Sequence, residues 1–337
     1  MPLILRDGRA LDETSDLVDD VNILKPHVSA LANASPAQSS RSLSLGSDFT
    51  PDISPISSST PSEVDPTEVR DVSTTTEPAE EKVFRDYANA CDRVKNFYAE
   101  QHEKQTMEYN LKARKYFHER EKLHMSVWEA IERLNTLVDD SDPDTSLSQI
   151  EHLLQTAESI RRDGKPDWMQ LVGLIHDLGK LLFFVGAEGQ WDVVGDTFVV
   201  GCQFSEKNIY PETFAANPDS THPVYSTPNG IYEPGCGMEN VMVSWGHDEY
   251  MYIVAKEQST LPKEGLAMIR FHSFYPWHRE NAYTQFMKEG DEDLLAAVRD
   301  FNPYDLYSKA DEPIDVESVK EYYQGLIAKY FPPVVEW

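Results

Sequence analysis

Apolar residues recur at helical spacing along most of the chain after residue 80, and this pattern predicts a mostly α-helical domain over 81–337. In the segment 125–138, for example, Val127, Ile131 and Leu134 lie about one turn apart. Further helices are predicted from the capping-box pair Ser146 and Gln149 to Gly164, from Pro166 to about residue 185, and over 239–256, 262–272, 283–300 and 315–330. The expected fold is therefore a single compact helical domain.

Residues 190–240 interrupt the helical pattern, because Gly, Pro, Asn and Asp are frequent there. The run from Thr197 to Val200 combines β-branched and aromatic side chains, which is typical of a strand. We expect this region to be an insertion of loop structure with a small β-hairpin.

Residues 1–80 have a different composition from the rest of the chain. They are poor in aromatic residues and rich in Ser, Thr, Pro and acidic residues, and the run from Ser35 to Ser62 shows no periodicity. Such a segment cannot bury enough apolar surface to offset the entropy lost on ordering it. The sequence therefore predicts an acidic, disordered leader ahead of one folded domain.

Charge and cysteine content narrow the possible partners. The formal net charge of -28 disfavours nucleic acid and anionic membrane surfaces as partners, because both are negatively charged. Cys91, Cys202 and Cys236 form no CxxC pair, which argues against a disulfide framework or a structural zinc site and suits a reducing compartment. No secretory pattern and no membrane-spanning apolar run is present. We expect a soluble, cytoplasmic monomer.

The strongest candidate chemistry lies in the segment 171–182, which is apolar nearly all round and should form a buried helix. It contains His176, Asp177 and Lys180 on one side of that helix, and buried ionisable groups are costly unless they are paired or bind a metal. The alternative is a structural ion pair between Asp177 and Lys180. Because a buried salt bridge is a poor source of stability, we favour a metal site.

A second His-Asp pair occurs at His247 and Asp248, followed by Glu249. Helical periodicity alone does not decide which of the three would bind a metal. The aromatic neighbours of His272 indicate burial, which fits a hydrogen-bonded core histidine and a metal ligand equally well. His278, which follows a proline, is expected outside the site.

Several other histidines are predicted to lie at the surface. His152 points away from the apolar stripe of its own helix, which Leu153, Leu154 and Ile160 help to form. The others lie in the leader or among charged residues, and they are His27, His102, His118 and His124.

Several motifs, found in a fixed order, resemble the myo-inositol oxygenase family. The order of His152, His176-Asp177 and Asp305 also resembles the H…HD…D ligand set of the HD-domain superfamily, a group of helical metalloproteins. The resemblance covers about 83–337 and leaves out the leader. The motifs that carry it are LVGLIHDLGK (171–180), VGDTF (194–198), SWGHDEY (244–250), IRFHSFYPWH (269–278) and DLYSK (305–309), with support from QTAESIR (155–161) and YYQGLIAKY (322–330).

The resemblance implies an HD-like fold and two iron ions, which form a mixed-valent Fe(II)/Fe(III) pair in the active form. Imidazole and carboxylate ligands suit iron. The implied metal ligands are His152, His176, Asp177, His247, His272 and Asp305. Within this set Asp177 would bridge the two irons, and His247 and His272 would complete the second.

The reaction implied by the resemblance is the O2-dependent cleavage of the C1–C6 bond of myo-inositol, which gives D-glucuronate and water as the first step of inositol catabolism. Lys180 and Asp177 would be the catalytic residues, with Lys180 stabilising a substrate alkoxide. The implied substrate contacts are Arg85, Asp139, Asp140, Ser141, Lys180, Gly195, Asp196, His272, Ser273 and Lys309.

Two other functions fit parts of the sequence. An HD-type phosphohydrolase acting on a nucleotide would use the same metal ligands. However, no cluster of basic residues for phosphate is evident beyond Lys180 and Lys309. A non-catalytic scaffold could recruit partners through the acidic leader, but the intact ligand motifs argue against it. The sequence therefore favours the oxygenase.

Overall fold

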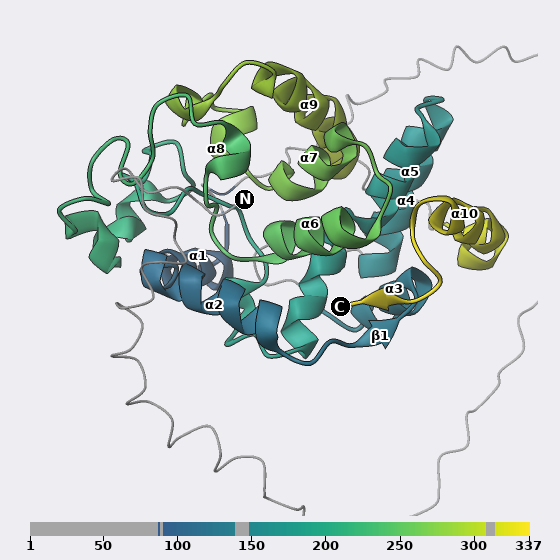
Figure 1. Ribbon diagram of the computed structural model, residues 1–337. Helices are drawn as coiled ribbons and strands as arrows, with labels where there is room; N and C mark the ends of the chain where they lie inside the picture. Colours follow the sequence, from purple (N-terminus) through teal and green to yellow (C-terminus); the bar gives the residue numbers. More distant parts are fainter. Residues whose placement is uncertain (1–86, 88–89, 139–147, 308–313) are drawn as a thin grey trace, which may run out of the picture. The chain divides into compact units, whose positions relative to one another are not determined.

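Helices form nearly all of the regular structure in the residues that the computed structural model describes, which are 87, 90–138, 148–307 and 314–337 (Figure 1). This confirms the predicted mostly α-helical fold. The predicted leader, 1–80, and five of the predicted substrate contacts lie outside the described residues, so the domain boundary stays a prediction. Those five contacts are Arg85, Asp139, Asp140, Ser141 and Lys309.

The helices differ in type between the domain and its insertion. The α-helices are α1 Asp92–Lys104, α2 Met107–Glu119, α3 Val127–Leu134, α4 Gln149–Arg162, α5 Asp167–Ile175, α6 His247–Gln258, α7 Lys263–Phe271, α8 Tyr275–His278, α9 Asp291–Tyr307 and α10 Val316–Tyr330. The 3-10 helices are η3 His176–Phe184, η4 Gln190–Asp192, η5 Pro211–Ala216, η6 Pro218–Thr221, η7 Met238–Asn240 and η8 Thr284–Phe286. Most of the 3-10 helices thus lie in or near the region that interrupts the helical pattern.

Local backbone chemistry explains where the observed helix starts differ from the predicted ones. The capping box of α4 is formed by Ser148 and Glu151, whose side chains each accept a hydrogen bond from the backbone N–H of the other residue. The helix therefore begins two residues later than the predicted pair, Ser146 and Gln149, would place it. The helix predicted from residue 283 begins at Asp291. Tyr283 and Gly290 have φ values of 59° and 92°, which are left-handed and incompatible with an α-helix.

The single helix predicted from Pro166 to residue 185 is divided into two types. It is α-helical in α5, and it tightens into the 3-10 helix η3 from His176 onward. A 3-10 helix has three residues per turn, so side chains at i and i+3 lie directly above one another. Asp177 and Lys180 are therefore aligned on one face of η3.

The only regular sheet in the described part of the chain is small and lies away from the insertion. Strands β1 (His124–Met125) and β2 (Val335–Glu336) pair antiparallel and join two distant parts of the chain. The hairpin expected around Thr197–Val200 is absent from the described residues. Val199 makes one isolated bridge to Val243, and Gly201, with φ of 81°, turns the chain directly after Val200.

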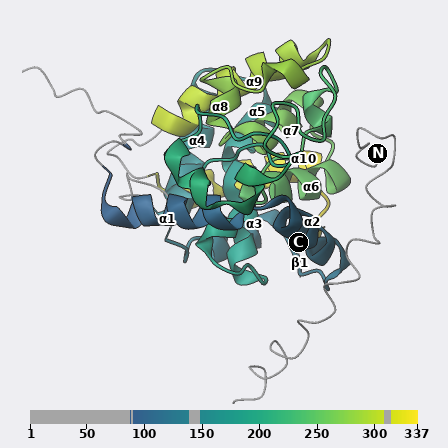
Figure 2. The ribbon, with the colours of Figure 1, turned by 90° about the vertical axis from the view of Figure 1, so that its left-hand side faces the viewer.

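Packing of the helices brings distant segments into a closed ring. α4 packs against α9, α9 against α7, α7 against α6 and α6 against η3, while η3 continues from α5, which packs against α4. Both views show α6 and α7 between α9 on one side and α1 and α2 on the other (Figures 1 and 2). The candidate metal ligands lie at or near the ends of these helices, on the inner side of the ring. No helix in the described ranges is long and apolar enough to cross a membrane.

His102, predicted at the surface, is instead buried in the core. Its ring stacks on Phe214 with a centroid distance of 3.8 Å, and its Nδ1 lies 2.6 Å from the hydroxyl of Thr213. Both partners belong to η5, more than a hundred residues further along the chain, so the charged neighbours of His102 in α1 gave no sign of its burial. Burial lowers the pKa of His102 to about 3, because the charged imidazolium is poorly solvated there.

This lowered pKa predicts a pH dependence of stability. The unfolded chain binds a proton at His102 below the ordinary histidine pKa of 6.5, whereas the folded chain does so only near pH 3. The contribution of His102 to the free energy of unfolding is therefore fully present above pH 6.5 and is lost as the pH falls. Between roughly pH 7.5 and 5.5 this group should lower the free energy of unfolding by about 1.4 kcal/mol. Urea unfolding of wild type and His102→Gln over this pH range, at equal metal loading, measures this pH dependence of the free energy of unfolding. Equal pH slopes in the two proteins would contradict the prediction.

Candidate metal centre

Six side chains from five elements meet inside the ring of helices. The metal ligands that the sequence predicted are brought together as follows: His152 on α4, His176 and Asp177 on η3, His247 at the start of α6, His272 directly after α7, and Asp305 on α9. Their separation along the chain shows that the site exists only in the folded domain.

Three of the histidines are held in one tautomer by backbone carbonyls. The Nδ1 atoms of His176, His247 and His272 lie 2.9, 2.8 and 2.9 Å from the carbonyl oxygens of Gly173, Val193 and Ile269. A carbonyl oxygen can only accept a hydrogen bond, so each Nδ1 carries the proton and donates it. The lone pair of each Nε2 therefore faces the centre of the site, as in metal-binding histidines.

The first group of donors contains His152, His176 and Asp305. The Nε2 atoms of the two histidines lie 3.1 and 3.3 Å from Oδ1 of Asp305. Both Nε2 atoms also lie 3.7 Å from Oδ2 of Asp177. Among the described residues, the buried Nε2 of His176 has no hydrogen-bond partner, although it points at this cluster of oxygens. The two imidazole nitrogens and the carboxylate oxygens therefore converge on one point, where they could bind a cation.

The second group uses the other oxygen of Asp177. Its Oδ1 lies 3.4 Å from Nε2 of His247 and 3.5 Å from Nε2 of His272. The two Nε2 atoms are 3.2 Å apart although both present lone pairs, an arrangement that needs a positive charge between them. Asp177 thus places one oxygen in each group, which is the geometry of a bridging carboxylate.

The two carboxylates are held in the ionised form that a ligand requires. Burial alone would raise the pKa of Asp177, but the neighbouring Lys180 ammonium and His176 outweigh it and hold this pKa well below its usual range. Lys180 Nζ donates to Oδ2 of Asp177 at 2.9 Å. Burial would raise the pKa of Asp305 as well, but its contacts with His152 and His176 hold that pKa well below the usual range.

The donor set fits a metal on chemical grounds. Each group can present three nitrogen and oxygen atoms within 4.8 Å of one another, counting one oxygen of Asp177 in each. Imidazole with carboxylate suits iron and other divalent transition metals. The ordinary alternative, a structural ion pair between Asp177 and Lys180, is present but leaves the converging imidazole lone pairs unexplained.

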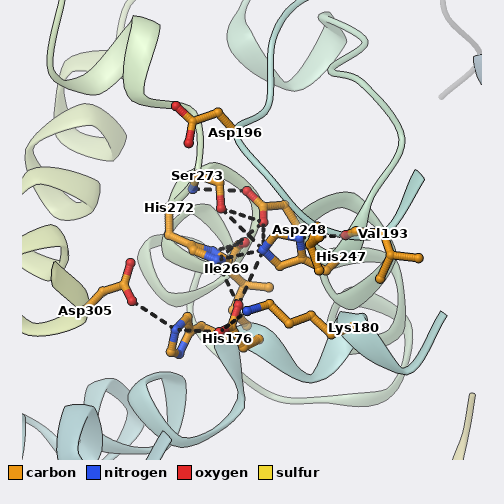
Figure 3. A network of polar contacts seen from close by, with 12 residues as sticks. His176, Lys180, Val193, Asp196, His247, Asp248, Ile269, His272, Ser273 and Asp305 are labelled. Carbon is orange, nitrogen blue, oxygen red and sulfur yellow. Dashed lines mark hydrogen bonds and ion pairs between the residues drawn. The ribbon is translucent and has the colours of Figure 1, made fainter. Parts of the chain in front are cut away.

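The predicted substrate contacts that the structure describes border this centre. Figure 3 shows the side chains of Lys180, Ser273 and Asp305 pointing toward the imidazoles from different elements, with Asp196 above them. Asp196 is buried, and the hydroxyl of Tyr98 donates to its Oδ1 at 3.4 Å. Gly195 has φ of 92°, and a Cβ there would meet the ring of Phe97 at 2.7 Å.

Sequence reasoning missed two parts of the site. Asp248, left open beside His247, is completely buried with Oδ1 2.6 Å from Nε2 of that histidine. Arg270 forms a buried pair with Glu249, with distances of 2.7 and 3.3 Å, and this pair ties α6 to α7 next to both histidines. Glu249 lies two residues after His247 and Arg270 two residues before His272, and this short spacing was the one sign in the sequence that the pair lies beside the site.

His278 is not part of either donor group but hydrogen-bonds to the backbone of one of the ligands, His272. Its Nε2 lies 3.0 Å from the backbone carbonyl oxygen of His272, which can only accept, so this nitrogen is the donor. A nitrogen that carries a proton has no lone pair to offer a metal. His278 therefore helps to hold the backbone of His272 in place.

The fold and the donor set define the class of protein: a helical protein whose His and Asp side chains form a site compatible with metal binding. Comparison with known proteins then narrows the class. The family model described as myo-inositol oxygenase matches residues 91–337. The chain belongs to the myo-inositol oxygenase family, as the motifs predicted.

Individual relatives support this membership across distant organisms. The inositol oxygenase of Dictyostelium discoideum is 51% identical over 261 residues, which cover 75% of this chain and 89% of that protein. Inositol oxygenase 2 of Arabidopsis thaliana is 52% identical over 262 residues, or 75% of this chain and 83% of the relative. The inositol oxygenase of Danio rerio is 46% identical over 259 residues, or 75% and 93%.

Proposed function

We propose that this protein is an inositol oxygenase that uses two iron ions to cleave the C1–C6 bond of myo-inositol. The observation that carries the proposal is the position of Asp177, whose two oxygens face two separate pairs of histidines. The reaction consumes one O2 and four electrons of the substrate. One oxygen atom enters D-glucuronate, the other leaves as water, and no external reductant is consumed.

The residues around the centre would bind the substrate and control its protons. When bound, iron would supply Lewis acidity toward a substrate hydroxyl and the redox chemistry with O2. Lys180 places a buried positive charge beside Asp177, where it would stabilise a hydroxyl that has lost its proton. Ser273 and Asp196 offer polar atoms to other hydroxyls, and a buried polyol needs such partners because an unpaired hydroxyl is costly.

The charges of the site support a neutral substrate over a nucleotide. Among the described residues, the half-buried Arg114 and the buried Arg270 pair with Glu249, and Lys180 pairs with Asp177. Because these basic side chains already pair with carboxylates, the described part of the site shows no cluster of basic groups arranged to hold the phosphates of a nucleotide. A scaffold role leaves the converging histidines unexplained.

The expected setting of the reaction follows from the same features. Cys91, Cys202 and Cys236 are free thiols, which supports a cytoplasmic location. The partners proposed are myo-inositol and O2, with the protein as a monomer. The net charge of -28 argues against nucleic acid and anionic membranes.

One assay separates the three functions. The full chain, loaded anaerobically with iron, is given myo-inositol and O2. Oxygen uptake matched by an equal amount of D-glucuronate supports the oxygenase. Phosphate release from nucleotides without oxygen uptake would replace it with the phosphohydrolase, and a protein that binds no metal and shows neither activity would favour the scaffold.

Replacing Lys180 with Met should leave metal binding intact but weaken catalysis. The variant removes the charge that would stabilise the substrate alkoxide, and we expect kcat/KM to fall roughly a hundredfold or more. Iron content and steady-state oxygen uptake measure the two effects separately. Lys329→Met is the matched control, because Lys329 also pairs with an aspartate, Asp167, but at the exposed surface. Loss of both metals in Lys180→Met would show that the lysine acts on the metal centre rather than on the substrate.

A further inference from the structure

Asp248 lies against the second donor group although it is not among the ligands that the family resemblance implies. It is completely buried, with 0% of the residue exposed. Its Oδ1 lies 2.6 Å from Nε2 of His247 and 3.3 Å from Nε2 of His272. Asp248 therefore faces the lone-pair side of both imidazoles, where a metal would be bound.

The contacts of Asp248 with the two imidazoles are favourable only when positive charge lies beside the carboxylate. His247 and His272 donate from Nδ1 to backbone carbonyls, so both Nε2 atoms are acceptors when the rings are neutral. A buried carboxylate placed against two neutral imidazole acceptors would be repelled, so this arrangement needs a positive charge on or between these groups. A metal ion between them turns the same arrangement into an attractive one.

Asp248 also makes the two donor groups equivalent. The first group has two imidazoles, one oxygen of Asp177 and a carboxylate of its own, Asp305. Without Asp248, the second group would have only two imidazoles and the other oxygen of Asp177. With Asp248, each position has its own carboxylate, so the negative charge that retains a cation is balanced between them.

The orientation of Asp248 is fixed by its other neighbours. The backbone N–H of Ser273 donates to Oδ2 at 3.1 Å, and the Ser273 hydroxyl lies 3.1 Å from Oδ1 (Figure 3). The buried pair of Glu249 and Arg270 holds α6 against α7 one residue away. The carboxylate therefore cannot turn to another partner without breaking these bonds.

We propose that Asp248 is the carboxylate of the second metal position, a positioning residue whose charge retains the metal bound by His247 and His272. The proposal rests on the proposed function, because it assumes a metal at this group. It goes beyond that function by assigning a seventh side chain to the centre and by making metal retention at the second position depend on it.

The test is a metal titration of the full-length metal-free protein with Co(II) under anaerobic conditions. Wild type should bind two equivalents. Asp248→Asn keeps the size and most hydrogen bonds but removes the charge. It should bind the first equivalent normally and the second at least about tenfold more weakly. Iron content after loading with Fe(II) should fall from two equivalents toward one.

Two control variants separate charge from folding. Asp192→Asn replaces another buried aspartate, one that is held by Tyr109 and backbone N–H groups outside the site, and it should bind both equivalents as wild type does. Ser273→Ala removes a hydrogen bond to Asp248 but not its charge, and it should keep the second equivalent. Should Asp248→Asn fail to fold, Asp248→Ser carries the same test with the same expected loss.

The outcomes distinguish this inference from the function it rests on. Two equivalents with wild-type affinity in Asp248→Asn would overturn the role of Asp248 and leave the two-iron proposal standing. A single equivalent in wild type would overturn the two-iron proposal and the inference with it. Equal weakening of both equivalents in Asp248→Asn would also overturn the inference, because it would show a general structural effect.

Discussion

Replacing Asp177 with Ala should remove both metal ions and abolish the oxygenase reaction. Oδ2 of Asp177 lies 3.7 Å from the first pair of histidines, and Oδ1 lies within 3.5 Å of the second pair, so one side chain serves both positions. Asp305→Ala removes a carboxylate from the first group alone. We therefore expect no bound iron in the first variant and about one equivalent in the second, measured by elemental analysis after anaerobic loading.

A control for folding is needed because Asp177 also pairs with Lys180. Removing one member of a buried ion pair costs about 3–5 kcal/mol, since the remaining charge is left uncompensated. The double variant Asp177→Ala/Lys180→Met removes both charges and should regain stability without regaining metal. Iron retained in Asp177→Ala at the wild-type level would show that the carboxylate does not bridge.

The first metal group shows how far local sequence patterns reach. The apolar surroundings of His176, Asp177 and Lys180 predicted a buried cluster, and the structure buries all three. The pattern did not reveal that η3 is a 3-10 helix, in which residues three apart are aligned. In this geometry Lys180 lies directly above Asp177, with its Nζ 2.9 Å from Oδ2 of Asp177.

Two histidines show where local patterns fail. His152 points away from the apolar stripe of α4 and looked like a surface residue, but its side chain is only 16% exposed because α9 brings Asp305 onto that face. His102 lies among charged residues of α1, and η5 covers it. In both cases the covering element is more than a hundred residues away, and a helical stripe carries no information about such a partner.

The second metal group could be assigned from sequence only through the family resemblance. Spacing left His247, Asp248 and Glu249 equivalent. The structure separates their roles by contacts that spacing does not contain. His247 is oriented by the carbonyl of Val193, Asp248 faces the imidazoles, and Glu249 turns away to Arg270.

Replacing Gly179 with Ala should break the contact that joins the two metal groups. A Cβ at Gly179 would lie 1.9 Å from the carbonyl oxygen of His247 and 2.7 Å from its Cα, so η3 and the start of α6 would have to separate. His247 cannot retreat easily, because its backbone N–H and Nδ1 both donate to the carbonyl of Val193 at 2.8 Å. We expect a loss of stability of about 3 kcal/mol or more, at the upper end for an overpacked core.

The same substitution should weaken binding of the second metal, because His247 moves away from Asp177 when the helices part. Urea unfolding and Co(II) titration measure the two effects. Gly325→Ala is the matched control, since Gly325 lies inside α10 and an added Cβ there would meet nothing within 4 Å beyond the neighbouring backbone of its own helix. That control should bind both metals and gain about 0.5–1 kcal/mol, because alanine favours a helix over glycine. Wild-type stability and metal binding in Gly179→Ala would mean that η3 and α6 do not need this close approach to form the site.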